Sequence, residues 1–261
     1  GSQGSPPTDQ ALLDHLAVRY AALGWSTKRL LREIVCSATY RQSSVTGAEA
    51  LARDPQNRLL TRAPRFRLEA EAVRDSALHV AGLLSDRKFG PSVMPPQPDG
   101  VWQIVYSNDA WRTSKGADRH RRSIYTFLRR SSPHPAMVAF DAPSRETCTV
   151  RRIRSNSPLA ALVTFNDPAL LEAARALAAR AMHGAADETA IASALLRRAL
   201  LREPLPAESA RLVELYRSER ERLAAEPDAV ASLASGDDAA LAAWTVVASA
   251  VLSLDEFLSR S

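Results

Sequence analysis

The chain lacks most of the motifs from which a reaction can be read. Only two cysteines, Cys36 and Cys148, occur in 261 residues, which excludes a disulfide framework, a CxxC metal site and a CxxCH haem motif but leaves one bridge open. The glycine fingerprint of nucleotide-binding proteins, the GxSxG elbow and the HExxH zinc motif are also missing. Because the five histidines are scattered, we expect no metal site built by this chain.

Long apolar runs are scarce as well. The longest, residues 239–254, is too short and too rich in Ala and Ser to span a bilayer, so it predicts a core helix and no transmembrane segment. The polar residues 1–10 carry no visible targeting signal. With 46% hydrophobic and 24% charged residues, the composition is that of a globular protein with a sizeable core.

Positive charge is concentrated in the middle of the chain. Residues 111–154 hold eleven Lys and Arg against three acids, a net charge of +8, whereas the whole chain carries only +5. A basic segment with interleaved aromatics is typical of nucleic-acid binding, but no helix-turn-helix, finger or RRM signature accompanies it. We therefore regard nucleic acid as an unlikely partner.

Helical patterns dominate residues 8–85. A capping pattern at Thr8 and a stop at Gly24 bound a first helix, and Ser26 caps a second, so the two predict a helical hairpin. Apolar residues at helical spacing in 66–84 predict a third helix. Trp25 and Trp244 lie in apolar helical contexts and are predicted to be core residues.

The middle segment, residues 86–165, has no long periodic pattern and contains six of the prolines between Pro91 and Pro135. Within it, residues 123–130 favour a strand because they combine β-branched and aromatic side chains. Residues 166–261 are helical again. Asp167 and Pro168 start one helix, a hairpin is broken at the prolines near 204–206, and acids at 237–238 begin a final helix. The sequence therefore predicts a mainly α fold, with helical hairpins at both ends around a long irregular Arg-rich middle with one short β element.

Four stretches together resemble one family. They are "PPTDQALLDHLAVRYAALGWSTKRLLREIVCSATYRQSS", "DPQNRLLTRAPRFRLEAEAVRDSAL", "DRHRRSIYTFLRRSSPHPAMVAFDAPSRETCTVRRIRSNSPLAALVTFNDP" and "LSLDEFL". They resemble the C-terminal domain of unknown function of planctomycete-type surface proteins, DUF1553 or PSD1. The resemblance spans nearly the whole chain in the expected order, which implies a single PSD1-like domain over residues 1–261.

The resemblance implies a setting but no reaction. Family members usually carry a related domain upstream and often a cytochrome c-like domain, so the implied protein is an exported bacterial protein. Any haem c would lie on other domains, and we expect no cofactor in this chain. The family commonly has His where this chain has Asp9, which argues against a catalytic or ligand role there. Cys36 departs from the family pattern whereas Cys148 fits it, which argues against a bridge between them.

The segment "FDAPSRETCTVRRIRSNSP", residues 140–158, leaves three interpretations open. As a catalytic site, Cys148 would be a nucleophile activated by arginines, with His134 and Asp141 as partners. As a binding site, unpaired guanidinium groups and an aromatic would hold an anionic ligand. The residues predicted for that ligand are Arg145, Arg151, Arg152, Arg154 and Trp111. As structure, arginines would pair with Asp141 and Asp167 and satisfy backbone carbonyls of the irregular middle.

We interpret the chain as a non-catalytic binding or assembly module of an exported, cytochrome-linked surface protein. Its basic segment is expected to contact the upstream domain of the same polypeptide or an anionic polysaccharide. The alternative is an enzymatic domain that acts on cell-surface polysaccharide, with a site near Asp141, Arg145 and Cys148. The ligand and the oligomeric state cannot be read from the sequence.

Overall fold

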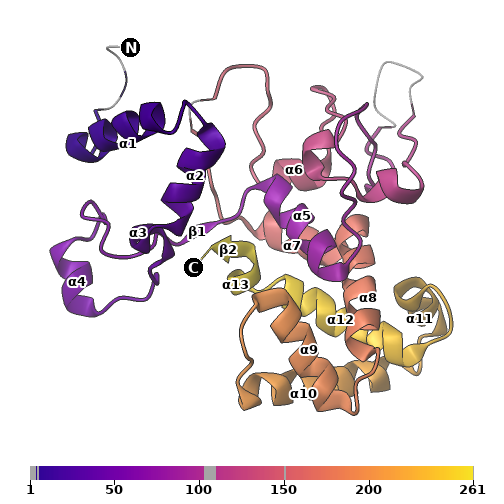
Figure 1. Ribbon diagram of the computed structural model, residues 1–261. Coiled ribbons are helices and arrows are strands. Elements are labelled where there is room, and N and C mark those ends of the chain that lie inside the picture. Colours follow the sequence, from indigo (N-terminus) through magenta and orange to yellow (C-terminus); the bar gives the residue numbers. More distant parts are fainter. Residues whose placement is uncertain (1–3, 5, 103–109, 150, 261) are drawn as a thin grey trace. The chain divides into compact units, whose positions relative to one another are not determined.

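The computed structural model describes residues 4, 6–102, 110–149 and 151–260. It divides into two compact units, with unit 1 formed by Gly1–Phe66 and Arg260–Ser261 and unit 2 by Arg67–Ser259. Figure 1 shows helices throughout both units and one small sheet of two strands, β1 (Phe66–Arg67) and β2 (Ser259–Arg260). The mainly α fold with one short β element is therefore confirmed. The single domain over 1–261 stays a prediction.

The described part of unit 1 contains four helices. They are α1 (Gln10–Ala22), α2 (Thr27–Cys36), α3 (Ala38–Arg41) and α4 (Ala48–Arg53). The predicted hairpin of α1 and α2 is confirmed, but α1 is capped by Asp9 and not by Thr8, since the Asp9 carboxylate accepts a hydrogen bond from the Leu12 N–H at 3.0 Å. Ser26 caps α2 as predicted.

Few side chains of unit 1 are buried. Neither α1 nor α2 contains a buried residue. Trp25 is 69% exposed, so the prediction that it belongs to the core is wrong. The reason lies in the backbone: the turn between the helices continues through Gly24 and Trp25 at φ of 67° and 58°, and this takes Trp25 out of the helical pattern on which the prediction depended.

Unit 2 contains the remaining helices that the structure describes. They are α5 (Ala70–Ala81), the 3₁₀ helices η1 (Gly116–His120) and η2 (Ser123–Tyr125), α6 (Pro135–Ala139), α7 (Pro158–Asn166), α8 (Pro168–Met182), α9 (Glu188–Leu200), α10 (Pro206–Leu223), α11 (Pro227–Ala234), α12 (Ala239–Leu252) and α13 (Asp255–Leu258). Asp167 caps α8 as predicted, accepting from the N–H groups of Ala169 and Leu170. The hairpin of α9 and α10 is confirmed.

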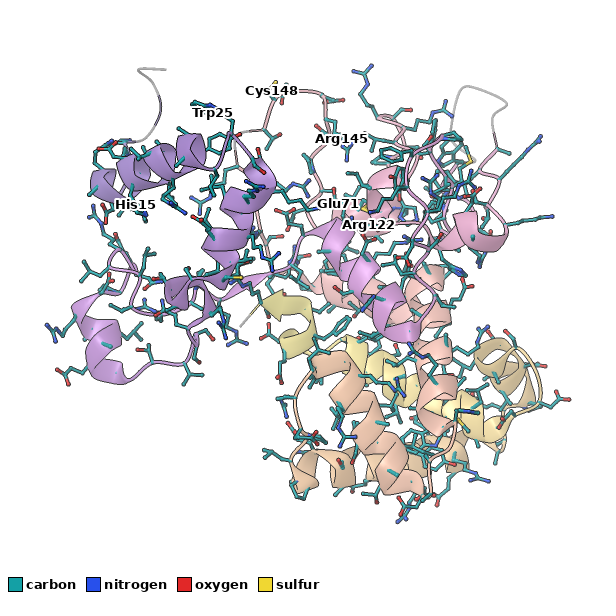
Figure 2. The ribbon with its side chains drawn as sticks, viewed as in Figure 1. His15, Trp25, Glu71, Arg122, Arg145 and Cys148 are labelled. Atoms are coloured by element: carbon teal, nitrogen blue, oxygen red, sulfur yellow. The ribbon has the colours of Figure 1, made fainter. Side chains whose placement is uncertain are left out.

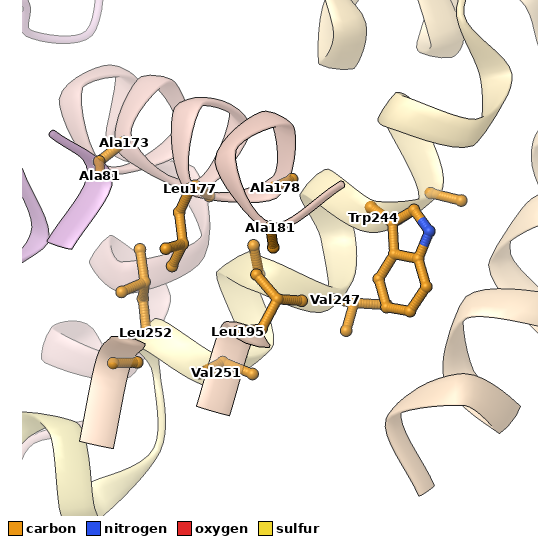
Figure 3. Packing of buried hydrophobic residues seen from close by; sticks show 14 of the residues in the cluster. Ala81, Ala173, Leu177, Ala178, Ala181, Leu195, Trp244, Val247, Val251 and Leu252 are labelled. Atoms are coloured by element: carbon orange, nitrogen blue, oxygen red, sulfur yellow. The ribbon is translucent and has the colours of Figure 1, made fainter. Parts of the chain in front are cut away.

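The core of unit 2 lies where α8 and α12 pack against each other and against α5, α9 and α10. Figure 3 shows Leu177 of α8, Leu195 of α9 and Val247 and Val251 of α12 in this cluster. Trp244 is 1% exposed and stacks on Tyr216 with ring centroids 4.2 Å apart, as its predicted core position requires. Each large side chain buried here contributes about 1.5–3 kcal/mol.

The middle segment differs from the prediction in two respects. No strand forms at residues 123–130: Ser123–Tyr125 is a 3₁₀ turn, and Thr126 makes only an isolated bridge with Val93. The Ser123 N–H donates to the Asp75 carboxylate at 2.7 Å, so a contact distant in sequence overrides the local β preference. The segment predicted to be irregular also holds α6 and α7, which both begin at a proline.

Two buried arginines hold this segment in place. Arg121 is 1% exposed and donates to the carbonyls of Pro91 and Phe89 at 2.9 and 2.5 Å, with its guanidinium 3.8 Å from the centre of the Tyr125 ring. Arg74 of α5 donates to the Arg121 and Arg119 carbonyls at 2.9 and 3.1 Å. Burial lowers the pKa of Arg74, and nearby carboxylates offset this only in part. Arginine donors therefore satisfy the carbonyls of an irregular chain, as the structural interpretation predicted.

Candidate functional site: a loop anchored by ion pairs

The sequence-predicted site residues lie mainly on one loop of unit 2, residues 142–154, whose two ends are held together. Asp141 accepts hydrogen bonds from the Ser155 N–H at 2.7 Å and from its hydroxyl at 2.9 Å, and it pairs with Arg67. Burial disfavours the ionised carboxyl, but these donors outweigh it and lower the pKa of Asp141. We name residues 142–149 and 151–154 the anchored loop.

A second set of contacts ties the anchored loop to the start of α5. Arg152 pairs with Glu71 at 2.6 Å and with Glu69 at 3.2 Å. Arg154 lies 3.5 Å from Glu69, and Arg145 lies 3.8 Å from Glu71. Although burial opposes ionisation of Glu71, its hydrogen bonds from Arg152 lower the pKa of this carboxyl. Three of the four arginines predicted to bind an anion therefore already have carboxylate partners.

The far side of the loop is exposed. Figure 2 shows Cys148 at the end of the loop away from Glu71 and Arg145. Cys148 is an exposed free thiol, and Ile153 is 78% exposed. Arg151 is exposed and makes no hydrogen bond or ion pair with the described residues. The anchored loop thus exposes the thiol of Cys148, the guanidinium group of Arg151 and the side chain of Ile153 to solvent. Ion pairs hold the rest of the loop against α5.

The three catalytic candidates do not meet in one group. His134 is buried, and its Nε2–H donates to the Pro96 carbonyl at 3.0 Å, while Nδ1 has no hydrogen-bond partner among the described residues. Burial lowers the pKa of His134 and so favours the neutral ring. Asp141 is committed to Ser155 and Arg67, and Cys148 is exposed. Within the described part of the chain, no hydrogen bond joins any two of the three candidates. A catalytic role for them stays the alternative hypothesis, and the absence of catalysis stays the prediction.

Trp111, the predicted aromatic of the ligand site, is used for packing. Its Nε1–H donates to the Pro95 carbonyl at 2.8 Å. Its ring lies edge-on to Trp102 at 5.2 Å and 5.9 Å from the His134 ring. The contacts of Trp111 therefore lie with the proline segment and His134, and those of Arg145, Arg152 and Arg154 lie with the start of α5.

Sequence reasoning did not identify the acids of this site. Glu69 and Glu71 stand at the N-cap and in the first turn of α5, where carboxylates suit the helix dipole. The segment "RLEAEA" carries that signal, but nothing local links it to arginines about 75 to 85 residues later. Such pairing follows only from the tertiary structure.

Unit 1 has a cavity of its own. A space of 380 Å³ lies between α1 and the turn that follows α4. Its lining includes Leu12, Leu13 and Leu16 of α1 and Leu60 of the turn. Asp54 fixes the turn by accepting from the N–H groups of Arg58 and Leu59, both at 2.8 Å.

The residues present do not fit a haem c, because covalent attachment needs two cysteines and a histidine in one CxxCH motif. Cys36 and Cys148 are single exposed thiols more than a hundred residues apart. Among the described residues, no group of three or more His, Cys, Asp or Glu side chains could hold a metal ion. No helix in the described ranges is long and apolar enough to span a membrane.

The fold and the anchored loop define a mainly helical protein with an arginine-rich, ion-paired middle. The chain belongs to the PSD1 family, described as "Protein of unknown function (DUF1553)", whose model matches residues 1–216. The resemblance to the PSD1 family is thereby confirmed for residues 1–216. The stretch "LSLDEFL" lies beyond the matched range, and a planctomycete-type surface protein stays a prediction. No curated protein and no solved structure matches the chain.

Proposed function

We propose that the chain is a non-catalytic assembly module and that the anchored loop is its docking element. The observation that carries this proposal is that three of the four loop arginines form ion pairs within unit 2 while the fourth is exposed. Arg145, Arg152 and Arg154 pair with Glu69 and Glu71, while Arg151 stays exposed. Internal pairing reduces the charge available to a polyanion and fixes the loop in one conformation, which lowers the entropy cost of binding.

The partner that this loop suits best is a protein surface, namely the upstream domain of the same polypeptide. An exposed aliphatic group next to one cation, Ile153 beside Arg151, suits a mixed apolar and acidic patch better than a uniformly charged glycan. The proposed setting, an exported surface protein with haem on other segments, rests on the domain order usual in the family. An anionic polysaccharide is the second ligand to test, because Arg151 and neighbouring cations remain in the basic segment.

The test is a calorimetric titration that measures binding of this chain to the separately produced upstream domain of the same polypeptide. The double variant Arg151→Ala/Ile153→Ser should bind at least about tenfold more weakly, which corresponds to about 1.4 kcal/mol. The matched control is Arg211→Ala/Leu201→Ser, which removes an exposed arginine and an exposed aliphatic group elsewhere in unit 2. Its affinity should stay within about twofold of the wild type.

A parallel titration with dextran sulfate, and with neutral dextran as its control, distinguishes the two partners. Salt-sensitive binding to dextran sulfate that depends on Arg151, without binding to the upstream polypeptide, would replace the protein partner by a polyanion. If the loop variant binds every probe as well as the wild type, or if the control variant loses as much affinity, the docking role of the loop is wrong.

A further inference from the structure

Helix α2 of unit 1 has an outward face that nothing in the site above uses. Lys28, Leu31, Arg32 and Val35 follow one another at spacings of three, one and three residues, so they share one side of the helix. All four are exposed, with Leu31 at 54% and Val35 at 42%. Trp25 precedes the helix and is exposed as well. Figure 2 shows it at the turn between α1 and α2.

This face carries positive charge without a counter-charge. The side chains of Lys28, Arg29 and Arg32 form no hydrogen bond or ion pair with any described residue. The only acid of α2, Glu33, lies off this face, since it follows Leu31 by two residues. It is bound to Arg19 of α1, which donates to both of its oxygens. Hydrogen bonding to Arg19 lowers the pKa of Glu33, so this acid stays ionised and engaged with α1.

The other side of α2 explains why the outward face is free. Leu30 and Ile34 are partly buried and point away from Lys28 and Arg32. The hydroxyl groups of Tyr20 in α1 and Thr27 share a hydrogen bond of 2.9 Å. The Tyr20 ring also packs edge-on against Trp25, with ring centroids 5.3 Å apart. The helix is therefore fixed to α1 by one side, while its cationic and apolar side is exposed.

We infer that the outward face of α2 binds the surface of an anionic phospholipid bilayer. Lysine and arginine attract acidic headgroups, and exposed Leu, Val and Trp side chains enter the boundary between headgroups and acyl chains. Trp25 is the residue type that this boundary favours, because its ring is amphipathic. A helix face that interleaves cations with exposed aliphatic side chains suits a broad, deformable acidic surface. With only two cations on this face, Lys28 and Arg32, the attachment is weak, reversible and sensitive to salt.

The experiment uses the full chain and vesicles of phosphatidylcholine with or without phosphatidylglycerol, separated by sedimentation. We expect binding to the acidic vesicles at low salt and its loss at high salt. The variant Lys28→Gln/Arg32→Gln should bind the acidic vesicles about 30-fold more weakly, on the basis of the usual contribution of each cation near an acidic surface. The control Arg198→Gln/Arg211→Gln removes two equally exposed charges from unit 2 and should keep its binding within about twofold.

A second readout follows Trp25 itself. Tryptophan emission should shift to shorter wavelength on addition of acidic vesicles. Trp25→Phe should abolish the shift, since Trp102 and Trp244 are buried already and the half-buried Trp111 packs against Trp102 and His134 in unit 2. Equal binding to neutral vesicles, wild-type binding by Lys28→Gln/Arg32→Gln, or an unchanged shift in Trp25→Phe each overturns the inference. So does binding to soluble polyglutamate through these cations without binding to vesicles. The variants of the anchored loop leave this assay unchanged, so the two proposals fail separately.

Discussion

Replacing Arg74 by methionine tests whether buried guanidinium groups hold the irregular middle of unit 2. Arg74 is buried and donates three hydrogen bonds to that segment: to the carbonyls of Arg121 and Arg119 and, at 3.3 Å, to the hydroxyl of Ser123. Methionine fills a similar space but donates nothing. Arg74→Met therefore leaves two carbonyl groups without their arginine donor while disturbing the packing little.

The magnitude follows from these contacts. A buried acceptor that loses its donor costs about 1–3 kcal/mol, so the two carbonyls together cost about 2–6 kcal/mol. Removing a buried charge relieves part of its desolvation penalty, which brings the expected loss to about 3 kcal/mol. For a unit of this size, that loss lowers Tm by about 6–12 °C.

The assay is urea and thermal unfolding of the full chain, followed by far-ultraviolet circular dichroism. Arg198→Met is the matched control, because Arg198 lies exposed on α9 and makes no hydrogen bond or ion pair with the described residues. It should change the free energy of unfolding by less than about 0.5 kcal/mol. Hydrogen exchange at residues 119–126 should accelerate in Arg74→Met alone. Equal stability of the two variants would refute the argument that arginine donors fix this segment.

Two further predictions concern α10 and a helix end. The pKa of Glu208 lies at about 2, below its usual 4.5, because Arg202 and the Leu205 N–H bond its carboxylate. The ionised carboxylate stabilises the fold fully above pH 4.5 and loses that effect as the pH falls toward 2. Glu208→Gln should therefore flatten the dependence of the urea midpoint on pH between these values. An unchanged slope would contradict this prediction. Gly82 and Gly184 share a φ of 74°, and a Cβ on Gly82 would lie 2.6 Å from the guanidinium group of Arg180, whereas one on Gly184 has no described atom within 4 Å. Because the Arg180 side chain is exposed and can move aside, Gly82→Ala and Gly184→Ala should each cost about 1 kcal/mol in denaturant unfolding, and a much larger loss in Gly82→Ala would contradict this reasoning.

Signals that act within a few residues were readable from the sequence. Ser26 and Asp167 cap helices as predicted, because a side-chain oxygen reaches an N–H two or three positions away. Trp244 is core because its whole helix is apolar. The core prediction for Trp25 was wrong because Gly24, at positive φ, separates it from the neighbouring helix and its apolar pattern.

Contacts between distant segments were not readable. The strand predicted at residues 123–130 gives way to a turn that Asp75 stabilises from 48 residues away. Arginines satisfy backbone carbonyls as expected, and Asp141 pairs with Arg67. The expected arginine partner of Asp167 is not found among the described residues, because this carboxylate caps α8 instead. Arg121, unremarkable among its neighbours in the sequence, is the most buried of them, whereas Arg151 is exposed.

The short hydrogen-bonded contact at the ends of unit 2 has a mechanical consequence. The Leu68 N–H donates to the Leu258 carbonyl at 2.8 Å, so the polypeptide enters and leaves unit 2 at neighbouring points. Tension applied to its two ends would load this backbone pair first and would reach the helical core only after the pair had opened. Because this hydrogen bond joins the first and last segments of unit 2, it would protect the packed interior from a force transmitted along the polypeptide.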